Sequence, residues 1–67
     1  MAVMYVVEQG SVLRKEGGRI VVEKGGEKLA SVPLIHIDRV LVFGNVQLTS
    51  PAIAALLEGG VDVSFFS

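Results

Sequence analysis

Two apolar, β-rich runs in the second half of the chain flank one short stretch with the signals of a capped helix. The runs span residues 35–43 and 61–66, and Gly44 and Gly59-Gly60 mark the breaks. Ser50 before Pro51 is a favourable helix start, because serine caps the first turn and proline at the first helical position forfeits no hydrogen bond. The order predicts a strand–helix–strand unit, whose crossover lets its two strands run parallel.

Hydrophobic periodicity assigns faces to these elements. Ile53, Leu56 and Leu57 follow the i, i+3, i+4 spacing of one helix face, and Gly59 fits a left-handed C-cap. In the first run, alternation predicts one face made of Ile35, Ile37, Leu41 and Phe43, with Val40 and Val42 on the other. A strand that is apolar on both faces is typical of a sheet covered on both sides.

The first half of the chain consists of short strand-like runs separated by glycine turns. The runs are residues 3–8, 11–16, 19–24 and 27–32, and Gly17-Gly18 and Gly25-Gly26 favour tight hairpins because glycine tolerates positive φ. The predicted fold class is mainly β (α+β), with a small antiparallel hairpin meander followed by a strand–helix–strand unit. We expect one domain over 1–67, with hairpins at 3–32, the strand–helix–strand unit at 35–66, six or so strands and one helix.

The chain is apolar for its size. It has 67 residues, of which 51% are hydrophobic, and a mean hydropathy of +0.60. A body this small buries only about 60% of its unfolded surface. It has no cysteine, so no disulfide adds stability. We expect some of the apolar surface to lie outside the core and to meet a partner.

The charge pattern does not favour autonomous nucleic-acid binding. The net charge is −1, and Arg14, Lys15, Arg19, Lys24 and Lys28 alternate with glutamates along the hairpins. A protein that binds nucleic acid alone usually carries a basic excess. No apolar run is long enough to span a membrane, and the N-terminus lacks the basic region of a signal peptide. With no cysteine, these features indicate a cytoplasmic protein.

No constellation for chemistry is evident. His36 and Asp38 would leave the same face of a strand, but a metal needs three or more ligands and Glu58 is only a distant third candidate. His36 is the one histidine that could serve as a base for a serine nucleophile. A phosphate-binding loop is not indicated either, because no glycine-rich turn leads from a strand into a helix that begins with a lysine. We therefore predict no catalytic, cofactor-binding or metal-binding residue, and interpret the chain as a binding or assembly module.

These residues resemble a known family over essentially the whole chain. The resemblance rests on Tyr5–Gly10, Leu13–Lys15, the two glycine turns, Pro33-Leu34, Ile37–Val40, Phe43–Thr49, Ala52–Leu57, Gly60-Val61 and Phe65. The stretch Phe43-Gly44-Asn45-Val46-Gln47-Leu48-Thr49 is its most specific part. Together they resemble the N-terminal β domain of the CRISPR-associated integrase, the metal-dependent DNA endonuclease of spacer acquisition.

The resemblance implies more than composition does. It implies a homodimer formed through N-terminal β domains, and a separate helical C-terminal catalytic domain that holds a divalent metal (Mg or Mn). It further implies a second CRISPR adaptation subunit and double-stranded DNA as partners of the full-length protein. No residue here matches the family's catalytic motifs, so the chain is expected to be non-catalytic and the enzyme activity to belong to the full-length protein.

Apolar strand residues are the predicted dimer contacts. They are Val3, Tyr5, Val7, Leu13, Ile20 and Val22. The candidate DNA contacts are Arg14, Lys15 and Arg19. Two alternatives remain open: a free-standing small β module whose apolar edge binds a peptide strand, and a minimal metallo-hydrolase that uses His36 and Asp38.

Overall fold

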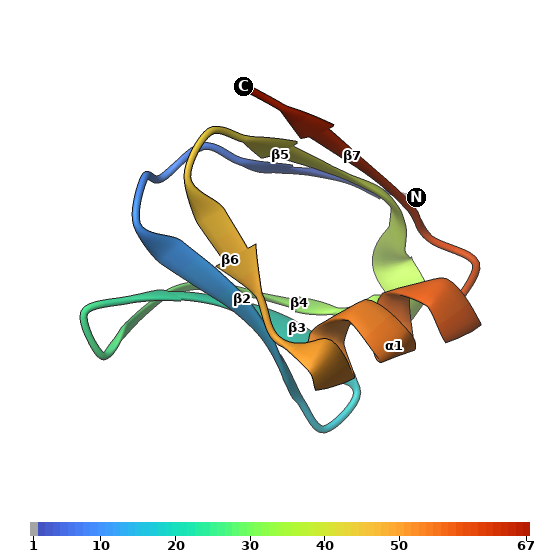
Figure 1. Ribbon diagram of the computed structural model, residues 1–67. Helices are drawn as coiled ribbons and strands as arrows, with labels where there is room; N and C mark the ends of the chain where they lie inside the picture. The colour runs from blue at the N-terminus through green and yellow to red at the C-terminus, as the bar shows by residue number, and fades with distance from the viewer. Residues whose placement is uncertain (1) are drawn as a thin grey trace.

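The computed structural model describes residues 2–67, which form seven strands, one α-helix and one 3-10 turn (Figure 1). The strands are β1 (Ala2–Val6), β2 (Ser11–Glu16), β3 (Arg19–Lys24), β4 (Glu27–Pro33), β5 (Ile37–Phe43), β6 (Val46–Leu48) and β7 (Asp62–Phe66). The helix α1 spans Ser50–Glu58, and the 3-10 turn η1 spans Leu34–His36. The mainly-β prediction, with a strand–helix–strand unit at the end, is confirmed.

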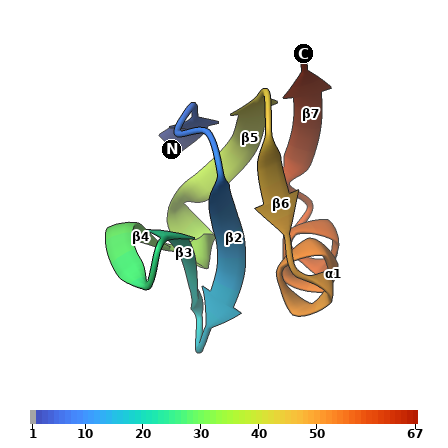
Figure 2. The ribbon, with the colours of Figure 1, turned by 60° about the vertical axis from the view of Figure 1, so that its left-hand side comes forward.

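The strands form two sheets that face each other. One sheet has three strands in the order β1-β5-β7, all parallel, and the other has four in the order β4-β3-β2-β6. Helix α1 packs against β2 of the second sheet and β7 of the first, so it closes one side of the sandwich (Figures 1 and 2). Within the described residues, no helix is long and apolar enough to cross a membrane.

The two hairpins predicted from the glycine turns are present. Strand β3 pairs antiparallel with both β2 and β4. Gly25 and Gly26 have φ values of 59° and 80°, a conformation that side chains with a Cβ rarely adopt. The β3–β4 ladder contains one irregularity, because Val22 pairs with Ala30 while Glu23 pairs with Lys28. Leu29 is thus the extra residue of a β-bulge.

The prediction that the first strand joins the meander is wrong. Strand β1 pairs with β5 in parallel, from Ala2 opposite Ile37 to Val6 opposite Val42. Residues 7–10 instead carry the chain from one sheet to the other, and the N–H of Gly10 donates to the carbonyl of Asn45 at 2.7 Å. The physical reason is that β1 is apolar on both faces, which suits a parallel sheet better than a solvated hairpin.

The predicted faces of the first apolar run are correct for Leu41 and Phe43 opposite Val40 and Val42, but they are wrong for Ile35 and Ile37. Ile37, Val40 and Val42 point into the core, while Ile35 lies in η1 and is 86% exposed. The β1–β5 register shifts between Ala2 and Val3, and this irregularity places Ile37 on the same side as Val40. Strand β6, which pairs in parallel with β2, was missed because three residues after a Gly-Asn break give little sequence signal.

Helix α1 begins one residue earlier than predicted. Thr49 is the N-cap, and its Oγ1 accepts from the N–H of Ala52 at 3.3 Å. The left-handed glycine after the helix is Gly60, with φ of 71°, rather than Gly59 at −82°.

The buried face of α1 consists of Ala52, Ala55 and Leu56. Ile53 and Leu57, predicted to share that face with Leu56, are exposed instead. Alanines at the contact let the helix backbone lie close to the sheets, whereas the larger side chains remain outside.

Candidate protein interface

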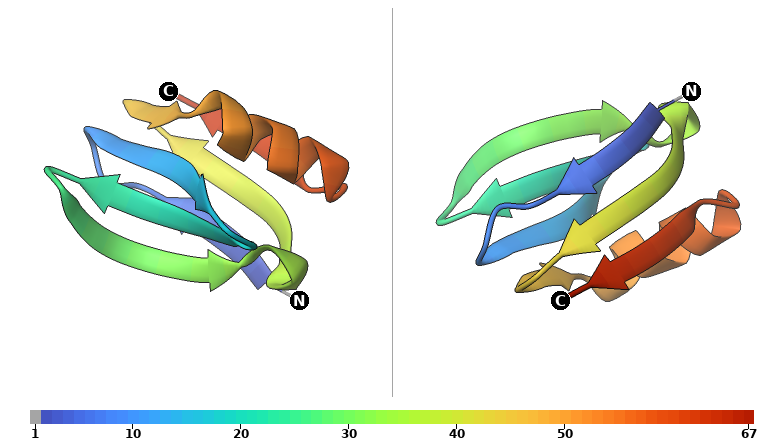
Figure 3. Two further views of the ribbon diagram at one scale, coloured as in Figure 1. Left: turned by 90° about the horizontal axis from the view of Figure 1, so that it is seen from below. Right: turned by 90° about the horizontal axis from the view of Figure 1, so that it is seen from above.

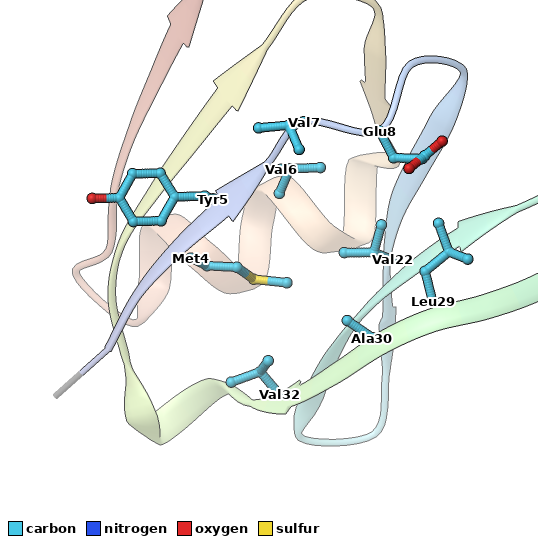
Figure 4. Close-up of a pocket in the computed structure, with 9 residues that line it drawn as sticks. All are labelled: Met4, Tyr5, Val6, Val7, Glu8, Val22, Leu29, Ala30 and Val32. Carbon is cyan, nitrogen blue, oxygen red and sulfur yellow. The ribbon is translucent and has the colours of Figure 1, made fainter.

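The β1-β5-β7 sheet has an inner face that packs on the other sheet and an outer face that does not. Met4, Val6, Val40 and Val42 point inward and are buried. Their neighbours along the strands point the opposite way, as Figure 4 shows for Tyr5 relative to Met4. We call this second surface the outer face; its apolar and aromatic residues are Val3, Tyr5, Val7, Leu41, Phe43 and Phe66, and its polar ones are Arg39, Asp62 and Ser64.

Three aromatic rings form a row across the outer face. The ring centroids of Tyr5 and Phe43 are 6.5 Å apart with an interplanar angle of 12°. The rings of Phe43 and Phe66 are 4.9 Å apart at 17°. One ring comes from each strand of the sheet, so the row crosses all three strands. Stacked pairs of this kind add about 0.5–1.5 kcal/mol beyond their buried area, which keeps the rings fixed as a flat apolar surface.

Charge is confined to one end of the outer face. Arg39 and Asp62 are opposite each other in the β5–β7 register, and their side chains approach to 3.9 Å. Both are more than half exposed, so this ion pair is worth only about 0–1 kcal/mol. Ser64, which is opposite Leu41 in the register, is the one other polar residue of β7 on this face. The remaining side chains of the face are apolar or aromatic, and Tyr5 is 64% exposed.

An all-parallel sheet is almost always covered on both faces. Here the four-stranded sheet covers the inner face, whereas no described residue covers the outer one. Large apolar patches of this kind on small proteins mark interaction surfaces. The outer face is therefore the candidate interface.

The structure separates the predicted dimer contacts into two groups. Val3, Tyr5 and Val7 are exposed on β1 and just after it, and they belong to the outer face. A second group lies in the core between the sheets: Leu13, Ile20 and Val22, with exposed fractions of 0%, 0% and 6%. Their side chains pack between the two sheets of the single chain, and an intermolecular contact through them stays a prediction.

The sequence analysis missed three apolar members of the outer face, Leu41, Phe43 and Phe66. The available signal was the residue pattern of β5, which is apolar on both sides. The described residues supply a core for one side only, whereas a parallel sheet is usually covered on both.

The candidate DNA contacts do not form one basic patch. Arg14 donates to Glu23 and approaches Glu16 at 3.5 Å, and these contacts, with the Glu23 hydrogen bond first, raise the pKa of its guanidinium. Arg19 donates to the hydroxyl and carbonyl of Ser31 at 2.8 and 3.2 Å. Lys15 leaves β2 on the face opposite Arg14, by strand alternation. Contact with DNA stays a prediction for these residues.

Glutamates neutralise much of this surface. Lys28 donates to Glu16 at 2.7 Å, which lowers the pKa of that carboxyl, with a smaller contribution from Arg14. On the same face, Val21 lies between Arg14 and Ser31 in the ladders and is fully buried. Long charged side chains can cover a hydrophobic neighbour with their aliphatic stems.

The arrangement of His36 and Asp38 that the sequence analysis considered for a metal site is not present in the structure. His36 lies in η1 and Asp38 lies in β5, so the two do not leave one face of a single strand. Across residues 2–67, no three histidine, cysteine or acidic side chains come together as a group that could hold a metal ion. The described residues do not fit the divalent metal that the resemblance implies for the full-length protein.

Comparison with known proteins identifies the family. Residues 4–67 match the family described as CRISPR associated protein Cas1. Two proteins of Thermus thermophilus, both named CRISPR-associated endonuclease Cas1, are 38% and 32% identical over 64 and 69 residues. The matches cover 96% and 100% of this chain but only 20% and 21% of those proteins, so the chain spans about a fifth of their length.

Solved structures show the same fold. A Cas1 protein from Thermotoga maritima superposes with a TM-score of 0.82 at 22% identity, covering 97% of this chain and 20% of that one. A Cas1–DNA complex gives 0.81 at 19% identity, covering 98% and 23%. A Cas6-RT-Cas1–Cas2 complex gives 0.91 at 19%, covering 96% and 7%. Since the family match extends over nearly every residue, the chain belongs to the CRISPR-associated protein Cas1 family.

Proposed function

We propose that this chain is the N-terminal dimerisation domain of a CRISPR-associated, metal-dependent DNA endonuclease/integrase that inserts new spacers, and that it has no catalytic role itself. The single observation that carries the proposal is the outer face, an apolar surface on an all-parallel sheet. Its occupant in the proposal is the outer face of a second copy. Membership of the Cas1 family supports the spacer-acquisition role.

A stable dimer through the outer face would need a standard interface, which removes about 800 Å² of surface from each partner. The accessible surface of the described residues is 4117 Å², so such a contact would cover about a fifth of it. A two-fold axis would bring the same residues together from both copies, so the aromatic row would meet its own counterpart.

The mechanism of this domain is geometric. Two catalytic domains attached to a rigid pair of β domains would be held at a fixed separation and orientation, as two reactions at two ends of one DNA require. In this proposal, the helical catalytic domain holds the Mg or Mn ion and the double-stranded DNA. The second adaptation subunit would correspond to the Cas2 of the Cas6-RT-Cas1–Cas2 complex, and it would join the assembly in the cytoplasm.

Sedimentation velocity over a concentration series tests the dimer. We expect the chain to be dimeric at micromolar concentration, and Leu41→Lys and Phe43→Lys to be monomeric because each buries a charge in the contact. Ile35→Lys, the same change at an exposed apolar residue in η1, is the matched control and should remain dimeric. A wild-type chain that stays monomeric, or a dimer that survives both outer-face variants, would contradict the proposal.

A further inference from the structure

The two layers of the sandwich have unequal numbers of strands. The sheet β4-β3-β2-β6 has four strands and faces a sheet of three. Strand β4 lies beyond β1 on the open side of the molecule (Figure 3), and its residues from Glu27 to Ser31 are exposed. The position beside β1 and opposite β4 is where a fourth strand of the β1-β5-β7 sheet would lie.

A pocket occupies this position. Its volume is about 230 Å³. Figure 4 shows Met4 and Val6 of β1 on the side of that strand that faces β3 and β4, whereas Tyr5 points away. The lining residues are Met4, Tyr5, Val6, Val7, Glu8, Val22, Leu29, Ala30 and Val32. All but Glu8 are apolar or aromatic. A cavity of about 150 Å³ with such a lining holds a benzene ring, so this pocket has room for one large apolar side chain.

The four sheet edges differ in how well they resist pairing with another strand. Edge strands are usually blocked by charges, prolines, bulges or short length. Strand β4 carries Lys28, Pro33 and the bulge at Leu29, while β6 has only three residues and β7 contains Asp62.

Strand β1 has none of these blocking features along its free edge. Its residues, Ala2–Val6, include no charge and no proline, and its one irregularity is at its start, between Ala2 and Val3. Val3 to Val6 then pair regularly with β5 on one side only. Among the described residues, β1 is the edge most open to a new strand.

We propose that β1 accepts an extended segment of a partner protein as a fourth strand of the β1-β5-β7 sheet. The backbone of that segment would satisfy the free N–H and C=O groups of β1, as in other cases of strand addition. Because alternate side chains of a strand point to opposite faces, one large apolar side chain of the segment would enter the pocket. Tyr5 and Val7 belong both to the pocket lining and to the outer face, so the variants that test this inference are placed at the β4 residues Leu29 and Ala30, away from the proposed dimer contact.

Binding of a designed peptide tests the proposal. The probe is a capped peptide of about eight residues, a typical strand length, with alternating Val and Thr and a central Leu. We expect it to slow hydrogen exchange at those β1 amides that do not bond to β5. A central Ala should weaken binding about tenfold or more, because the pocket is left unfilled. N-methylation of alternate peptide amides should abolish it, because the edge hydrogen bonds cannot form.

Two variants of the protein test whether the peptide binds at the pocket beside β1. Leu29→Lys places a charge at the pocket, and Ala30→Trp fills it; both residues are exposed, so the fold has no need of either side chain. Each should weaken peptide binding about tenfold. Leu57→Lys, the same change on the exposed side of α1, is the control and should bind normally. Leu29→Lys should leave the dimer intact, which separates this test from that of the proposed function.

Three results would overturn the proposal: no protection of β1 by the Leu peptide, equal binding of the N-methylated peptide, or full binding by both variants. Protection of the same β1 amides that rises with protein concentration, without peptide, would assign the edge to a second copy and also overturn it.

Discussion

Gln9 accepts a hydrogen bond from the backbone N–H of Asn45 through its Oε1 atom, at 2.8 Å and across 36 residues of sequence. Its Nε2 atom donates to the carbonyl of Phe43 at 2.8 Å. Residues 7–10 and residues 44–45 each connect the first sheet to the second. The side-chain amide of Gln9 therefore links these two connecting segments by hydrogen bonds. The position between those bonds is Gly44, whose missing side chain leaves the space that the Gln9 amide fills.

Gly44→Ala should destabilise the fold by about 2 kcal/mol or more. Gly44 has φ of 78°, which an alanine adopts only with strain, and a Cβ there would collide with the Gln9 amide. Urea unfolding followed by circular dichroism measures the change. Gly18→Ala is the matched control, since no atom lies within 4 Å of its Cβ position. Equal stability of the two variants would show that the contact between Gln9 and Gly44 does not constrain the fold.

Gln9→Ala should cost about 1–2 kcal/mol, because two long-range hydrogen bonds to the backbone are lost and one end of the sandwich loosens. In the double variant with Gly44→Ala the two losses should be less than additive, since alanine at residue 44 already displaces the glutamine side chain. Strictly additive free energies of unfolding would mean that the two residues act independently.

Thr49→Ala should cost about 1 kcal/mol through loss of the cap on α1. Ser50→Ala should change stability much less, because Ser50 is the first helical residue and its side chain makes no capping bond. Thermal or urea unfolding of both variants distinguishes the capping residue. A larger loss for Ser50→Ala would restore the sequence-based assignment of the cap.

The ion pair between Glu16 and Lys28 predicts a pH dependence. Because Lys28 lowers the pKa of Glu16 in the folded state below its ordinary value of 4.5, the folded chain binds fewer protons than the unfolded chain. The stability from this pair is therefore present above that ordinary value and is lost as pH falls through the lowered folded pKa. Glu16→Gln should therefore flatten the acid side of the stability curve relative to the wild type. Parallel curves for wild type and Glu16→Gln would contradict this.

The sequence analysis predicted the pairing of strands that are adjacent in the chain, but it did not predict the pairing of strands that are distant in the chain. The hairpins around Gly17 and Gly25 were predictable, because the turn chemistry and the pairing strands are adjacent in the chain. The partner of β1 was not, since β5 lies more than 30 residues away and two apolar strands can pair in either direction. The helix start was predicted within one residue because Thr49 and Ser50 are both good caps.

The candidate interface was predicted in part for a related reason. Val3 and Tyr5 carry the same alternation as Leu13 and Ile20, and periodicity does not tell a face covered by the same chain from one left open. Only the sheet order, with β1 at an edge and β5 in the centre, separates the two. The bulge at Leu29 had no sequence signal beyond one leucine in a polar strand.

The aromatic row also has a spectroscopic consequence. Tyr5 is the single tyrosine and there is no tryptophan, so ultraviolet emission excited above the phenylalanine band comes from one ring on one surface. Any event that shields the Tyr5 ring from solvent can therefore be followed by the intrinsic fluorescence of the unlabelled protein, without a contribution from tyrosine or tryptophan residues in the core.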